Sequence, residues 1–193
     1  SQGRVREILT SGGMQLVLDY AHENGRLASI TAVRGDDRLV LVTYGHDEQG
    51  QLASVTDANG AVVRRFTYVD GLMTSHVNAL GFTCSYEWAD VAGQSRVVAT
   101  HTSEGEHWTF GYDVTARESW VNHADGRTAR WKYDEQNQIV ACTDLDGAQY
   151  AIENNDAGMP VKIHLPGDRT VSLEYDEAGR IVAETDPLGR TTK

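Results

Sequence analysis

The sequence predicts an all-β protein, built as a repeat array of antiparallel β-hairpins that form one curved, twisted sheet. The first observation is a sequence motif that begins at Tyr133 and again at Tyr175, with a copy midway that begins at Asn154. Both steps are 21 residues, and we call the first residue of each copy its marker. A fixed period of this size is the signature of a repeat architecture. The second observation is the alternation of apolar and polar residues before each of these markers, and the third is a Gly- and Asp-rich turn after it. Together they indicate strand, turn and strand in every repeat.

Further markers lie at similar steps before Tyr133, and the residues two and four places before each marker are mostly apolar. The residues between them are mostly polar, so each marker ends a strand with one apolar face. Arg64 and Asn154 depart from this rule. In chain order, we expect the structural stripe to consist of Leu18, Tyr20, Val42, Tyr44, Phe66, Tyr68, Phe82, Tyr86, Trp108, Phe110, Tyr112, Trp131, Tyr133, Ile152, Leu173 and Tyr175.

A second short strand is expected after each marker turn, for example at residues 138–142 and 180–184. Apolar residues in these strands are often three apart, as at Leu27 and Ile30, which strict alternation does not explain; a β-bulge or a marked twist would reconcile them. A second turn, such as HADG or DPLG, then closes the unit. One repeat is therefore a hairpin of roughly twenty residues, and the chain holds about eight hairpins or roughly sixteen strands.

The predicted domain organisation is a lead-in over residues 1–15 and a repeat array over residues 16–193. A content of 40% hydrophobic residues suits one domain of ordinary size. The net charge of −11 argues against a nucleic-acid partner. The negative charge is explained either by a soluble surface or by an acidic lining that faces a basic partner. We expect no membrane span and no signal peptide in this segment. The last residues, TDPLGRTTK, lack a capping unit, which favours a segment of a longer protein.

Catalytic, cofactor and metal sites are not expected. The seven histidines form no HxxxH or HExxH pattern, and paired carboxylates such as Asp134 and Glu135 fall in turns. No GxSxG or phosphate-binding loop occurs. Cys84 lies on the stripe and is expected as a buried free thiol, although pairing with Cys142 stays open.

Two tryptophans suggest a different function. Trp108 and Trp131 lie on the stripe, where packing explains them. Trp88 and Trp120 are less clearly placed, and they could form a patch on which a sugar ring stacks.

The segment YDEAGRIVAETDPLGRTT, residues 175–192, resembles the YD repeat of the Rhs family of bacterial polymorphic toxins, which is shared with teneurins and insecticidal toxin complexes. YDEQNQIVACTD, which begins at Tyr133, is similar to it as well. The resemblance implies a segment of a shell that encloses a C-terminal toxin domain until delivery, through type VI secretion or a related route. It also implies self-cleavage near a closing DPxGL motif. Here Asp186-Pro187-Leu188-Gly189 is followed by Arg190, so this segment lacks that motif.

The expected function is therefore a structural, non-catalytic wall segment of a secreted or exported bacterial protein. Its expected partners are the rest of the parent shell and an enclosed toxin. The segment by itself is expected to self-associate through its open strand edge or its apolar face. The alternative is an adhesive or carbohydrate-binding module at a cell surface. We do not expect an enzyme.

Overall fold

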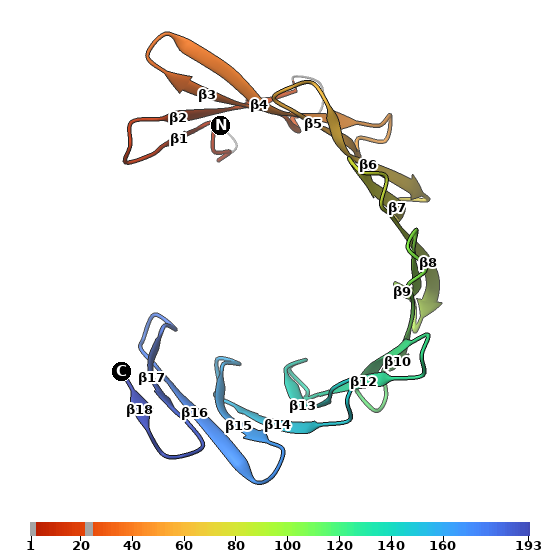
Figure 1. Ribbon diagram of the computed structural model, residues 1–193, viewed down its shortest axis with the longest axis vertical. Coiled ribbons are helices and arrows are strands. Elements are labelled where there is room, and N and C mark those ends of the chain that lie inside the picture. Colours follow the sequence, from red (N-terminus) through yellow and green to blue (C-terminus); the bar gives the residue numbers. More distant parts are fainter. Residues whose placement is uncertain (1–2, 22–24) are drawn as a thin grey trace. The chain divides into compact units, whose positions relative to one another are not determined.

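The computed structural model describes residues 3–21 and 25–193 (Figure 1). These residues form eighteen β-strands and no helix. The chain divides into two compact units, one made of residues 1–87 and 101–105 and the other of residues 88–100 and 106–193. No helix in the described part of the chain is long and apolar enough to cross a membrane.

The first unit holds β1 to β7 and most of β8. Each of these strands pairs with the next one in antiparallel orientation. The strands are β1 (Glu7–Leu9), β2 (Gln15–Tyr20), β3 (Leu27–Arg34), β4 (Asp37–His46), β5 (Leu52–Asp57), β6 (Val62–Val69), β7 (Leu72–Asn78) and β8 (Thr83–Val91). Residues 101–105 join this unit, where the Ser103 amide donates to the Thr83 carbonyl oxygen at 2.9 Å.

The second unit holds most of β9 and all of β10 to β18, and its strands from β10 onward follow one another antiparallel along a bent path (Figure 1). The strands are β9 (Gln94–Thr102), β10 (His107–Asp113), β11 (Glu118–His123), β12 (Thr128–Tyr133), β13 (Ile139–Thr143), β14 (Gln149–Asn154), β15 (Pro160–Leu165), β16 (Arg169–Tyr175), β17 (Ile181–Thr185) and β18 (Thr191–Thr192). The predicted all-β array of antiparallel hairpins is confirmed.

The described residues form two strands more than the roughly sixteen that the sequence indicated. β1 falls within residues 1–15, which were expected as a lead-in, and β18 follows the last turn. Both are short, with three and two residues, and neither has the alternating pattern from which strands are recognised.

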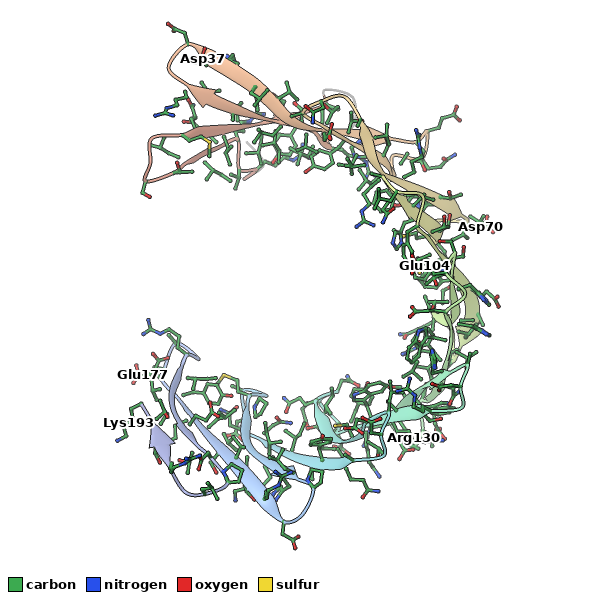
Figure 2. The ribbon with its side chains drawn as sticks, in the orientation of Figure 1. Asp37, Asp70, Glu104, Arg130, Glu177 and Lys193 are labelled. Atoms are coloured by element: carbon green, nitrogen blue, oxygen red, sulfur yellow. The ribbon has the colours of Figure 1, made fainter. Side chains whose placement is uncertain are left out.

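The sheet is a single layer in each unit, with side chains on both sides of the ribbon (Figure 2). Its buried residues are small, namely Ala99, Ala129, Ala183 and Thr31, and no large side chain among the described residues is fully buried. The accessible surface is 13102 Å², whereas a globular protein of 21.2 kDa exposes about 9,100 Å². The expectation of a buried Cys84 is accordingly wrong, because Cys84 is only half-buried. Within the described residues, no second layer covers either face.

A β-bulge recurs at the marker position. Lys132 pairs with Ala141 but Tyr133 pairs with Ile139, so Val140 is the extra residue. The same shift occurs beside Asn154 and Tyr175 in this unit, and beside Tyr20 and Tyr68 in the first. A bulge adds one residue to a strand and so moves the following side chains to the other face. This extra residue, Ala28 in β3, accounts for the three-residue spacing of Leu27 and Ile30.

One marker differs from the sequence-based assignment. In β4 the bulge lies beside His46, and the turn bond from the Asp47 amide to the Gln51 carbonyl oxygen matches the bond from Asp134 to Gln138. His46 is thus the structural equivalent of the marker in this repeat, two residues beyond Tyr44. Since a shift of two residues keeps the same face, Val42 and Tyr44 remain on the face to which they were assigned.

Candidate functional site

The registers of the second unit place the marker tyrosines and their neighbours on one face of the sheet. Direct partners run across five strands in one row, which consists of Tyr112, Ser119, Trp131, Cys142 and Tyr150. Since alternate residues of a strand share a face, this face also carries Phe110, Tyr133 and Ile152, and the pairs that run from Ile152 through Ile163 to Val171 extend it to Leu173 and Tyr175. We call this face of the second unit the tyrosine face.

The opposite face of the second unit is more polar. Its corresponding row consists of Gly111, Trp120, Arg130, Thr143 and Gln149. The neighbouring row brings Glu118 opposite Lys132, with Nζ 3.8 Å from Oε1. We call this the polar face, and Arg130 is labelled on it in Figure 2.

The marker side chain ties its strand to the strand before it. Tyr175 Oη donates to the carbonyl oxygen of Pro160 at 2.8 Å, and Tyr68 Oη donates to that of Leu52 at 3.0 Å. Each accepting residue lies two places beyond the last paired residue of its ladder. Tyr20 and Tyr112 make the same contact, to Val5 and Val97 at 2.8 Å. The marker thus satisfies a backbone acceptor at the end of the ladder, where no ladder partner faces it.

Two markers bond to a side chain instead. Tyr133 Oη lies 2.9 Å from Ser119 Oγ, and Tyr86 Oη lies 3.1 Å from His76 Nδ1. His76 stands between Phe66 and Cys84 in the register of the first unit, with its ring centroid 6.4 Å from that of Phe66. Burial raises the pKa of the Tyr86 hydroxyl, and hydrogen bonding to Cys84 adds to the effect.

The stripe residues of the first unit also share rows. Leu18, Ile30 and Val42 are direct partners, and Tyr44 pairs through Val55 with Arg64. Arg64, which departs from the apolar rule, is exposed. Trp108, Phe82 and the remaining stripe residues are half-buried. The role assigned to the stripe as a whole stays a prediction.

The turns are held by Asp or Asn side chains at their first position. Asp176 Oδ1 accepts from the amides of Ala178 and Arg180, and Asp186 Oδ1 accepts from those of Leu188 and Arg190. The Arg180 amide, followed by its side chain, lowers the pKa of Asp176, whereas the Arg190 side chain is the main cause for Asp186. Gly179, at φ 77°, supplies the left-handed residue that closes the turn. These carboxylates have structural partners, which does not suit acid–base chemistry.

Trp120 and Trp88 were the predicted sugar-stacking residues. The Arg130 guanidinium lies 5.0 Å from the Trp120 ring centroid, and a Cβ at Gly111 would overlap the same indole. Trp120 is therefore packed between Gly111 and Arg130 on the polar face. Trp88 is half-buried. The sugar-stacking role of Trp88 and Trp120 stays a prediction.

A hollow of about 510 Å³ lies in the second unit, at the end of the tyrosine face where the hairpins turn. Its lining includes Gln94, Arg96, Tyr112, Arg117, Ser119 and Tyr133. The guanidinium carbon of Arg96 stands 5.0 Å from the Tyr112 ring centroid, and burial raises the pKa of the Tyr112 hydroxyl. Groups of three or more metal-ligating side chains do not occur among residues 3–21 and 25–193.

Comparison with known proteins identifies the repeats. The family model described as RHS Repeat matches residues 46–83 and 155–191. Over 138 residues, 72% of this chain, the sequence is 66% identical to Double-stranded DNA deaminase toxin A of Burkholderia cenocepacia, of which it covers 10%. The chain belongs to the Rhs/YD-repeat family.

Other similarities agree with membership of the Rhs/YD-repeat family. Toxin protein Tse5 of Pseudomonas aeruginosa is 31% identical over 153 residues, 79% of this chain and 10% of that protein. Teneurin-1 of Gallus gallus is 25% identical over 175 residues, 85% of this chain and 6% of that protein. The chain thus spans a tenth or less of the length of each of these three relatives.

Solved structures share the fold. The Tc holotoxin pore of Photorhabdus luminescens matches with a TM-score of 0.51 at 11% identity, over 96% of this chain and 13% of that one. A TcdB2-TccC3-TEV structure matches with a TM-score of 0.51 at 15% identity, over 96% and 11%. The Rhs/YD repeats of this chain therefore form a shell-like structural fold, and toxins are among its relatives.

Sequence reasoning missed the residues that lie beside the markers. Ser119 forms a hydrogen bond with the Tyr133 hydroxyl, and His76 forms one with the Tyr86 hydroxyl. The Arg96 guanidinium lies over the Tyr112 ring. All three are polar residues in the strand before the marker strand. A search for polar residues 10 to 16 places before each Tyr would have found them, because the partners lie at those separations.

Proposed function

We propose that this chain is a structural, non-catalytic wall segment of an Rhs-type shell that encloses a C-terminal toxin polypeptide. In this proposal the protein is exported, through type VI secretion or a related route, and delivered to competitor or host cells. The observation that carries the proposal is the single-layer sheet, whose tyrosine face is not covered by a second layer of the described residues. Wall and cargo would each cover apolar surface that the other leaves exposed.

The relatives support the same function. Two of them are named as toxins, and each is about ten times as long as the stretch that matches. A wall needs regular hydrogen bonding and no reactive groups, which agrees with turn carboxylates that are engaged by backbone amides. The toxin activity itself would belong to another part of the parent protein.

Limited proteolysis of the full-length parent protein tests the proposal. We expect its C-terminal segment to resist a soluble protease that digests the same segment when it is expressed alone. Trp131→Asp on the tyrosine face should expose the segment, whereas Lys132→Ala, on the polar face of the same strand, should leave it protected. Equal digestion of the enclosed and the free segment would refute the enclosure.

A further inference from the structure

Arg96 has a guanidinium that is only partly hydrogen-bonded, in a chain whose net charge is −11. It lies on β9, and its side chain lines the hollow at the end of the tyrosine face. Its Nη2 donates to Gln94 Oε1 at 2.9 Å, and its flat face lies over Tyr112. Its Nε is buried and has no hydrogen-bond partner within the described parts of the chain. A buried N–H without an acceptor is unfavourable, so this edge of the guanidinium is incompletely satisfied.

The carboxylates around the hollow are already engaged. Glu135 Oε1 lies 3.3 Å from Arg117 Nη2, and Asp113 Oδ1 accepts the Ala116 amide at 2.8 Å. Glu118 also lines the hollow, and its Oε1 lies 3.8 Å from Lys132 Nζ. Within residues 3–21 and 25–193, Arg96 forms no ion pair. Its positive charge is therefore available to an anion that enters the hollow.

The geometry of the guanidinium decides which anion fits. Nε–H and one Nη2–H point in the same direction along one edge, and their spacing matches the two oxygens of a carboxylate. Gln94 has one amide oxygen, which satisfies Nη2 and leaves Nε–H unpaired. Gln94 is exposed, so its side chain can move aside at little cost. A carboxylate in its place would accept from both groups at once.

We propose that Arg96 is a carboxylate-binding site, in which Gln94 occupies the place of the ligand until a carboxylate displaces it. The ligand class is a polypeptide that presents an acidic side chain or its C-terminal carboxylate to the hollow. Ser119 and Tyr133, whose hydroxyls lie 2.9 Å apart in the same hollow, can hydrogen-bond the peptide groups beside that carboxylate. The site rests on the hollow alone, and it can exist whether or not the chain encloses a toxin.

The test uses the 193-residue chain and short peptides, with the Arg96 Hε–Nε signal followed by ¹⁵N NMR. One probe is acetyl-Ala-Glu-Ala-amide, a second is acetyl-Ala-Ala-Ala with a free C-terminus, and acetyl-Ala-Gln-Ala-amide is the uncharged control. We expect a carboxylate probe to move the Arg96 signal and the glutamine peptide to leave it in place. A shift with the first probe indicates that the site takes an acidic side chain, and a shift with the second indicates that it takes a C-terminal carboxylate.

Variants separate a specific site from general charge attraction. By calorimetry, Arg96→Lys should weaken binding by roughly tenfold, because the ammonium keeps the charge but loses the paired donors. Arg117→Lys, in the same hollow, should bind as the wild type does. Gln94→Ala should bind more tightly, since the competitor of the ligand is gone. Equal binding by Arg96→Lys and wild type, or no binding of either carboxylate probe, would overturn the proposal.

Gln94→Glu tests the geometry without any added ligand. Its carboxylate should occupy Nε and Nη2 of Arg96, raise the melting temperature and abolish peptide binding. A melting temperature at or below that of the wild type, with peptide binding retained, would contradict the site even if Arg96→Lys failed to fold.

Discussion

The side-chain amide of Asn154 donates a hydrogen bond to the carbonyl oxygen of Ile139 at 3.1 Å. This is the contact that a tyrosine hydroxyl makes in other repeats, where Tyr175 reaches Pro160 over the same separation of fifteen residues. A residue that breaks the apolar rule thus keeps the function of the marker. The marker slot requires a donor that reaches the preceding strand, and an aromatic ring is one way to provide it.

Tyr175→Phe should therefore destabilise the chain, although the ring stays in place. The lost hydrogen bond is worth about 1 kcal/mol, because the Pro160 carbonyl oxygen loses its partner in a half-buried place. Denaturant unfolding measures the difference. Tyr44→Phe is the matched control, since the Tyr44 hydroxyl makes no such bond within the described residues. An equal loss of unfolding free energy in Tyr44→Phe would argue against a stabilising role of the hydrogen bond from Tyr175 to Pro160.

Gly111→Ala should destabilise the second unit by about 1–3 kcal/mol, because the added methyl group overlaps the Trp120 indole. Thermal unfolding checks the size of the effect, and near-ultraviolet circular dichroism reports displacement of the indole. Gly12→Ala is the control, since no atom lies within 4 Å of the added Cβ. In a double-mutant cycle, Trp120→Val should recover part of the loss; strict additivity would mean that the two residues do not touch.

Acid should loosen the turns. The pKa values of Asp176 and Asp186 are lowered by their hydrogen bonds, so the folded state favours the charged form of both. Their contribution is present above the unfolded pKa of about 4 and is lost as the pH falls through the lower folded values. Melting temperatures from pH 6 to pH 3 should fall less steeply in an Asp176→Asn, Asp186→Asn double variant. Asn is the suitable replacement because Asn155 accepts the same amide bonds in its own turn. Parallel curves of melting temperature against pH for the variant and the wild type would exclude these two carboxyl groups as a cause of the loss of stability in acid.

The isolated chain should self-associate through its uncovered apolar surface. Light scattering at modest concentration should give a mass above 21.2 kDa. Ile181, the register partner of Tyr175, is 58% exposed, and Ile181→Glu should shift the chain toward the monomer. Thr170→Glu adds the same charge on the polar face and should have little effect. A clean monomer in the wild type would remove the basis for this expectation.

The strands and their faces followed from the sequence because a strand has a period of two, and Tyr133, Trp131 and their equivalents repeat it in every unit. The bulge could not be separated from twist, since both explain the spacing of Leu27 and Ile30 and only the register distinguishes them. His46 was missed as a marker because the markers were recognised as tyrosines, and Tyr44 lies two residues before His46 on the same face.

The candidate site was less accessible to sequence reasoning. Arg96 lies in a strand that carries no marker, and its importance comes from what its guanidinium lacks. Whether a polar atom has an acceptor depends on three-dimensional neighbours such as Gln94, and no spacing rule reports it. The packing of Trp120 against Gly111 was hidden for the same reason, because a glycine gives no sign of what lies over it.

The extra residue at Val140, Val161 and Val182 recurs with the period of the repeat. Each hairpin therefore accommodates its own extra residue, because Trp131 with Cys142 and Tyr133 with Ile139 remain partners on either side of the bulge. The next hairpin then begins with its side chains on the same faces. Duplication or loss of a whole repeat in the gene would leave the orientation of every other repeat intact, whereas a gain of one residue within a strand would reverse the faces downstream of it. The length of such a protein can then change during evolution in steps of one hairpin, which is how walls of different extent could arise from one sequence pattern.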